Sequence, residues 1–204
     1  MPENNQDRRI IKTKKNLGEA LMRLLCKKNL NEITTSELCK EANVSRATFY
    51  NNFVTTSDVL AYQLKTFFLD DSGSIQSISD KNVISLNKAY LFYVTRVVHN
   101  IILKKDIVCK IMDFKRDTGE MTLALREFFY TTIMDIIMPY KSLIEENVPL
   151  ELFCNYLALS DVGLVYYISN HLDDYSEEKL VNYIYHLSFE IYYDFIEKSS
   201  FELK

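Results

Sequence analysis

The stretch from residue 45 to 52 concentrates side chains that form directed hydrogen bonds, in the order Ser-Arg-Ala-Thr-Phe-Tyr-Asn-Asn. A guanidinium group can donate two parallel hydrogen bonds to one guanine, whereas hydroxyl groups commonly contact phosphate oxygens. Phe49 and Phe53 lie four residues apart, so a helix here would have one apolar face between its polar ones. The pattern predicts a short helix that packs on one side and presents hydrogen-bonding groups to a nucleic acid on the other.

Capping residues mark the elements that must position this helix. Thr34 and Glu37 are spaced as a capping box, which would begin a preceding helix. Asn43 falls where the chain must reverse, and Asn adopts left-handed dihedral angles more readily than most residues. Ser45 is a favourable N-cap for the second helix. Together these signals predict a helix-turn-helix, whose second helix enters the major groove of DNA.

The run from Ile33 to Leu60, ITTSELCKEANVSRATFYNNFVTTSDVL, resembles the N-terminal domain of TetR-type transcriptional regulators. In that family a Thr opens the second helix, a small-Gly-Val-Ser turn follows, and Thr-Phe-Tyr-x-His-Phe leads into a fourth helix. Here Asn43, Asn52 and Thr56 stand where the family usually has Gly, His and a phosphate-binding Lys. The resemblance implies a DNA-binding surface formed by Thr34, Thr35, Ser45, Arg46, Ala47, Thr48, Tyr50, Asn51, Asn52 and Thr56.

Two roles remain open for Arg46, which stands at the start of the second helix of the motif. Its guanidinium could read a guanine, or it could bind a phosphate without reading sequence. The resemblance places the hydroxyls of Thr48 and Tyr50 near phosphates. If Arg46 binds phosphate, base reading would pass to Ala47, Asn51 or Asn52.

Charge is distributed unevenly along the chain. Residues 1–65 contain 11 Lys and Arg against 7 Asp and Glu, whereas residues 66–204 have a net charge of −8. A basic cluster crowds the start of a first helix expected over 7–28. Such a cluster is usually a solvated face, but beside a helix-turn-helix it favours phosphate contact or a minor-groove arm. Its members are Arg8, Arg9, Lys12, Lys14 and Lys15.

The remaining periodic segments all have helical spacing, and no convincing strand pattern occurs, so the expected fold is all-α. We expect an N-terminal helix-turn-helix domain over 1–63 and a larger helical bundle for regulation and dimerisation over 64–204. A shared fourth helix would cross the boundary. The stretch 70–80, rich in Ser and Asp, is expected to be a loop.

The last two expected helices, over about 149–171 and 176–198, have more apolar surface than one core requires. They could be wrapped completely within one subunit, or two copies of the pair could form a four-helix interface. The resemblance to TetR regulators implies a homodimer of the second kind. The residues predicted at that interface are Leu157, Leu164, Ile168, Ile184, Ile191 and Phe195.

The resemblance also implies an effector pocket among the central helices of the larger domain. Aromatic and Met side chains could line it, although each such residue alone is more often part of a core. The predicted pocket residues are Phe92, Tyr93, Phe114, Phe129, Tyr130, Met134 and Tyr156. The effector is either a small molecule or a protein partner that docks on this domain. A cavity of several hundred Å3 would favour the former, and a filled core with an exposed apolar patch the latter, on general grounds.

Catalytic sites are not expected. The chain has four Gly, too few and too scattered for a phosphate-binding loop or a dinucleotide fingerprint. The three His do not form a metal-binding motif, and His171 beside Asp173 and Asp174 is better explained as a residue at a helix C-terminus. We therefore expect no enzymatic activity, no metal site and no cofactor.

The expected location is cytoplasmic. The N-terminus lacks the apolar core of a signal peptide, and no uninterrupted apolar run approaches the roughly 18 residues of a membrane span. The four Cys are scattered without metal-binding spacing and are expected to be reduced thiols.

Overall fold

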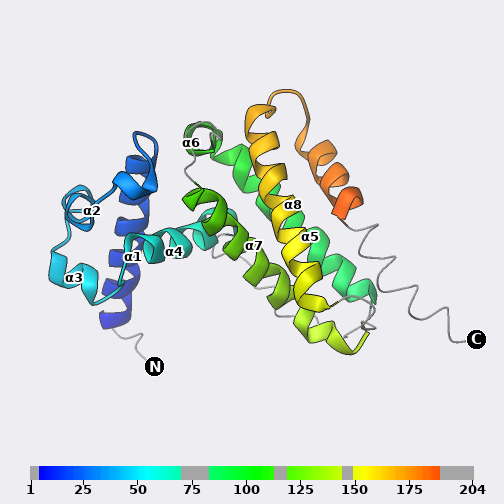
Figure 1. The fold of residues 1–204 in the computed structure, drawn as a ribbon, viewed down its shortest axis with the longest axis horizontal. Helices are drawn as coiled ribbons and strands as arrows, with labels where there is room; N and C mark the ends of the chain where they lie inside the picture. Colours follow the sequence, from blue (N-terminus) through cyan, green and yellow to red (C-terminus); the bar gives the residue numbers. More distant parts are fainter. Residues whose placement is uncertain (1–4, 70–82, 113–118, 144–148, 189–204) are drawn as a thin grey trace, which may run out of the picture.

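The computed structural model describes residues 5–69, 83–112, 119–143 and 149–188. Every regular element within these ranges is a helix, which confirms the expected all-α fold (Figure 1). The predicted loop at 70–80 lies outside the described residues. So do three predicted site residues, Phe114, Ile191 and Phe195.

Three helices form one end of the molecule (Figure 1): α1 (Asn5–Leu25), α2 (Thr35–Ala42) and α3 (Arg46–Tyr50). Their shared core contains Leu17, Leu21, Leu38 and Phe49, all fully buried. The first helix ends at Leu25, earlier than the sequence predicts, and a single 3-10 turn, η1 (Leu30–Glu32), leads into α2.

Helix α4 (Thr56–Leu69) joins this end to the larger bundle, because it packs against α1 on one side and against α5 and α7 on the other. A reciprocal cap begins α4: Asp58 accepts from the backbone N–H of Thr55 at 2.7 Å, and the Thr55 hydroxyl accepts from that of Asp58 at 3.2 Å. These backbone hydrogen bonds lower the pKa of the Asp58 carboxyl.

The larger bundle contains α5 (Val83–Leu103), α6 (Lys105–Ile111), α7 (Glu120–Ile137) and α8 (Leu150–Asn170). Residues 177–188 form a further helix beside α8 (Figure 1). Helix α7 gives way to a 3-10 helix, η3 (Met138–Leu143), where Pro139 cannot donate the next hydrogen bond. The contact between α7 and α8 is the most extensive helix contact among the described residues.

By length and composition, α8 could also cross a membrane. However, 56% of its most apolar stretch is buried inside the fold, as in the core helix of a folded domain.

One face of α5 holds the C-terminal end of α4. Asn100 Nδ2 donates to the carbonyl of Phe68 at 3.0 Å, and the Arg96 guanidinium donates to that of Leu69 at 3.5 Å. Lys104 Nζ donates to the carbonyl of Phe67 and lies 4.4 Å from the centre of the Phe67 ring. The last carbonyls of a helix lack hydrogen-bond partners within the helix. Cations at this end interact favourably with the negative end of the helix dipole. The three side chains therefore couple α4 to α5.

Candidate nucleic-acid interface and regulatory cavity

The cap predicted for α2 forms only in part. The Thr34 hydroxyl accepts from the backbone N–H of Glu37 at 3.2 Å, as expected. The Glu37 carboxylate, however, binds Lys28 Nζ at 2.6 Å instead of reaching back to the cap. Lys28 brings a full positive charge, which the backbone N–H of the cap lacks, and the ion pair anchors α2 to the chain just beyond the end of α1.

The turn before α3 follows the sequence prediction closely. Asn43 has φ 52° and ψ 48°, in the left-handed region, and its N–H donates to the carbonyls of Cys39 and Lys40. The Ser45 hydroxyl accepts from the backbone N–H of Thr48 at 3.0 Å, which begins α3. The hydroxyls of Ser45 and Thr48 also lie 2.8 Å apart, so one donates to the other and one hydroxyl proton remains free for a phosphate oxygen.

Burial divides α3 into an inner and an outer face. Phe49 and Phe53 are buried against the core, whereas Arg46, Ala47 and Asn51 are exposed. Asn52 is half-buried, and its amide donates to the Thr48 carbonyl at 2.8 Å, so this side chain helps to end the helix. The outer face thus carries the groups suited to a groove. All ten residues predicted to contact DNA are exposed or half-exposed: Thr34, Thr35, Ser45, Arg46, Ala47, Thr48, Tyr50, Asn51, Asn52 and Thr56.

The basic cluster of α1 does not act as one group. Lys14 Nζ lies 5.6 Å from the centre of the Phe53 ring and 5.7 Å from that of Tyr62, a cation–π arrangement that supports the end of α3. Arg9 and Lys12 are exposed. In Figure 1 the N-terminal end of α1 and α3 lie at the same lower left part of the molecule.

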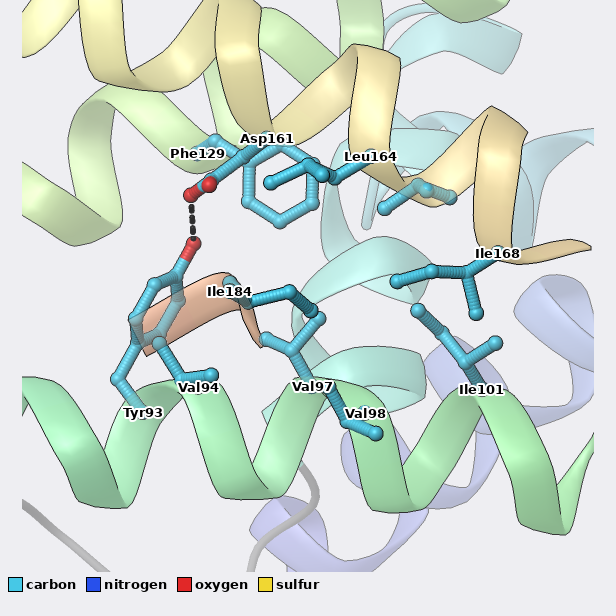
Figure 2. A pocket seen from close by; sticks show the side chains of 11 residues that line it. Tyr93, Val94, Val97, Val98, Ile101, Phe129, Asp161, Leu164, Ile168 and Ile184 are labelled. Carbon is cyan, nitrogen blue, oxygen red and sulfur yellow. Dashed lines mark hydrogen bonds between the residues drawn. The ribbon is translucent and has the colours of Figure 1, made fainter. Parts of the chain in front are cut away.

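A cavity lies in the larger bundle, between α5, α7, α8 and the helix at 177–188 (Figure 2). The space open to the centre of a water-sized sphere is about 20 Å3, enough for one water-sized group and far below several hundred Å3. Its walls are mostly aliphatic. The lining residues are Tyr93, Val94, Val97, Val98, Ile101, Phe129, Asp161, Leu164, Val165, Ile168 and Ile184.

The polar end of this cavity is a buried pair. Tyr93 Oη donates to Asp161 Oδ2 at 2.8 Å, and Asp161 is only 6% exposed. Burial raises the pKa of the Asp161 carboxyl to about 7, although the hydrogen bond from Tyr93 opposes that rise. Burial, together with the carboxylate of Asp161, also raises the pKa of Tyr93 well above its ordinary value. The pair can therefore exist with Asp161 neutral or charged near neutral pH, while Tyr93 keeps its proton.

Two of the predicted pocket residues, Tyr93 and Phe129, line the cavity. Tyr130 and Met134 are half-buried against the core without lining it. Phe92 and Tyr156 point outward and are exposed, so the prediction needs correction at these positions. Asp161 is absent from the predicted pocket residues, although a single acidic residue within the apolar run LALSDVGLVYY is a detectable signal.

No protein-family model and no curated protein matches the sequence. A solved structure from Shewanella sp. PV-4, described as that of a candidate TetR family transcription regulator, superimposes with a TM-score of 0.55 and 14% identity. The match covers 88% of this chain and 97% of that one. The chain has a TetR-like fold.

Within this TetR-like fold, several residues predicted at the dimer interface lie inside the subunit. Leu164, Ile168 and Ile184 line the cavity, and Leu157 is only 1% exposed. Leu157, Ile168 and Ile184 are buried within one subunit and cannot also form a surface between subunits, so the prediction is corrected at these positions. Leu164 is half-exposed, and its place at an interface stays a prediction. The large apolar side chains that α8 and the helix at 177–188 leave exposed are Leu152, Tyr156, Leu159, Tyr167, Tyr183 and Leu187.

The exposed residues of α8 form one stripe. Leu152, Tyr156, Leu159, Gly163 and Tyr167 follow one another at intervals of three or four residues, which places them on one side of the helix. A Cβ atom added at Gly163 would meet nothing within 4 Å, so the surface there is open. We call this set the α8 stripe.

Proposed function

We propose that the protein is a TetR-type transcriptional regulator that binds duplex DNA through α3 and the N-terminal part of α1. The observation that carries this proposal is the outer face of α3. Capped by Ser45 and set by the left-handed turn at Asn43, it presents Arg46, Ala47 and Asn51 outward. These residue types and this position suit a major groove, and such a regulator acts in the cytoplasm.

The proposed DNA-binding domain covers residues 1–63, and the proposed regulatory domain covers 64–204. The boundary falls inside α4, which packs against both parts. A rigid helix shared in this way can pass a displacement of the larger bundle to α3.

The proposed regulator is a homodimer that binds a near-palindromic operator. Each subunit has a single helix-turn-helix, and twofold symmetry would place two copies of α3 at half-sites about one DNA turn apart or a multiple of it. The α8 stripe supports this arrangement. It is a long apolar surface beside a second exposed pair, Tyr183 and Leu187, and Gly163 would permit close approach of a partner helix.

The proposed role is repression that an effector relieves. The cavity supports a small-molecule effector, because it has aliphatic walls and one polar end. A second candidate, control by a protein partner, is favoured by the small volume of about 20 Å3 and by Leu91 and Phe92, which are exposed on α5.

Selection from random duplex DNA tests the proposed function. The wild-type protein should enrich a near-palindromic sequence. Arg46→Ala should lower affinity for that sequence by about 1–3 kcal/mol and relax the preference at one position in each half-site. Tyr50→Phe serves as the control, since loss of a phosphate contact weakens cognate and scrambled DNA alike.

Each result has a defined meaning. Enrichment of no sequence by the wild-type protein would contradict the proposed function. Full sequence preference in Arg46→Ala would instead assign Arg46 to the phosphate backbone and base reading to its neighbours on α3.

A further inference from the structure

The cavity has a chemical polarity that indicates what it could bind. Figure 2 shows Tyr93 and Asp161 meeting at one end, while Ile101 and Ile168 face each other at the other. Between them the walls are aliphatic. A matching ligand would have one polar group at one end and a hydrocarbon part behind it.

The charge at the polar end of the cavity further limits the class of ligand that could bind. Oδ2 of Asp161 accepts one hydrogen bond, and within the described residues Oδ1 takes part in none. None of the 11 lining residues is a Lys, Arg or His. A buried carboxylate without a cation is costly to keep ionised. A ligand with a positive charge therefore gains more binding free energy here than a neutral ligand does.

We propose that this cavity is the binding site for an aliphatic amine, whose ammonium group pairs with Asp161 and whose hydrocarbon part lies along the aliphatic walls. This inference rests on the proposed function, because it names the class of effector for that site. An ammonium group can donate to Oδ1 while Tyr93 continues to donate to Oδ2.

The present volume sets a condition on binding. About 20 Å3 accommodates the ammonium group, but the hydrocarbon part must displace side chains such as Leu164 or Ile184. Binding therefore favours a conformation in which α8 and the helix at 177–188 stand further from α5. A ligand shifts such an equilibrium only through its preference for one conformation, and the present cavity, too small for the hydrocarbon part, supplies that preference.

Helix α5 would carry this change to the DNA-binding end. Val94, Val97 and Ile101 of α5 line the cavity, while Arg96 and Asn100 on another face hold the last carbonyls of α4. A displacement of α5 by the ligand would thus move α4, which packs against α1. Amine binding should consequently change DNA affinity.

The test uses the full chain and primary alkylamines from methylamine to octylamine, with alcohols of equal chain length as neutral controls. Calorimetry at fixed ionic strength should show amines that bind at least about tenfold more tightly than the matching alcohols. Asp161→Asn should weaken amine binding by about the same factor. Asp135→Asn, which changes an exposed carboxylate on α7, should leave amine binding unaltered.

The pH dependence gives a second readout. The amine pairs with ionised Asp161, whose pKa is about 7, so amine affinity should rise between pH 6 and pH 8. Tyr93 of α5 is the other titratable lining residue, and it stays protonated because its pKa is raised. α7 contributes Phe129 and the helix at 177–188 contributes Ile184, neither of which ionises.

A filling variant keeps the proposal testable if Asp161→Asn does not fold. Leu164→Phe retains the carboxylate but occupies the cavity, and it should lower amine affinity as well. Equal binding of amines and alcohols, or unchanged amine binding in both variants, would overturn the inference.

DNA binding is measured separately on the same samples. Sequence-specific DNA binding that amines do not alter would overturn the inference and leave the proposed function standing. Absence of DNA binding would count against the proposed function, whereas loss of amine binding in Asp161→Asn would still support the cavity as an amine site.

Discussion

Replacing Asp161 by Asn should stabilise the protein above neutral pH. The variant keeps an oxygen that accepts the hydrogen bond from Tyr93, and it removes a buried group that can ionise. The pKa of the Asp161 carboxyl is about 7, against an ordinary value of 3.8. In the unfolded chain this carboxyl is ionised at much lower pH than in the fold.

The sign follows from proton binding. Between pH 4 and pH 7 the folded state retains the proton of Asp161 and the unfolded state has lost it, so the free energy of unfolding falls as pH rises. Above pH 7 the Asp161 carboxyl is ionised in both states, and the free energy of unfolding falls no further through this group. The two pKa values correspond to a total of about 4 kcal/mol, of which about 3 kcal/mol is lost between pH 5 and pH 8.

Urea denaturation at fixed protomer concentration measures this effect for the wild type and for Asp161→Asn. The difference between them should grow by about 3 kcal/mol from pH 5 to pH 8, with the variant more stable at pH 8. Carboxyls whose pKa is lowered, such as those of Glu41 and Asp58, contribute equally to both proteins and cancel. Asp135→Asn should show no such trend.

Two outcomes would refute this reasoning. A difference that stays constant with pH would mean that Asp161 ionises as readily in the fold as in water. A variant that is less stable at pH 8 would mean that an unseen partner stabilises the charged carboxylate.

Three further predictions concern packing. Leu159, on the α8 stripe, is 54% exposed, and Leu159→Glu should give a monomer by light scattering. Leu123 on α7 is 62% exposed, and Leu123→Glu should leave the proposed dimer intact. A dimer in both variants would place the interface elsewhere. Gly18→Ala should lower the melting temperature, because the added Cβ would lie 2.0 Å from Gln63 Oε1. Adding Gln63→Ala to this variant should restore the melting temperature. A Gly18→Ala protein that melts like the wild type would show that the Gln63 side chain moves aside without cost. Asn100→Ala should reduce the free energy of unfolding by about 1–3 kcal/mol in urea, since buried carbonyls of α4 and α5 lose a donor; no change would mean that water replaces the amide.

The helix-turn-helix could be predicted in detail because its determinants are local. The cap at Ser45 joins residues three apart, and the left-handed turn at Asn43 depends on the conformational preference of one residue. The apolar pair Phe49 and Phe53 follows from helical periodicity alone. The all-α class follows in the same way, because each helix carries its own period and its own end signals.

Glu37 shows where local signals end. Its spacing from Thr34 predicts a reciprocal cap, but the Glu37 carboxylate forms an ion pair with Lys28, which precedes η1. The choice between a local N–H and a distant cation depends on where the end of α1 comes to lie, which is a property of the packed domain.

The cavity and the α8 stripe were decided by tertiary structure. α8 is apolar on nearly every side, so its periodicity does not show which face turns inward. The sequence therefore predicts Leu157 and Ile168 at a surface between subunits, although they pack within one. Tyr93 and Asp161 stand 68 residues apart in the sequence and meet because α5 and α8 line the same cavity. Local sequence determines the helices and their caps, whereas the burial that raises the pKa of Asp161 exists only once those helices enclose it.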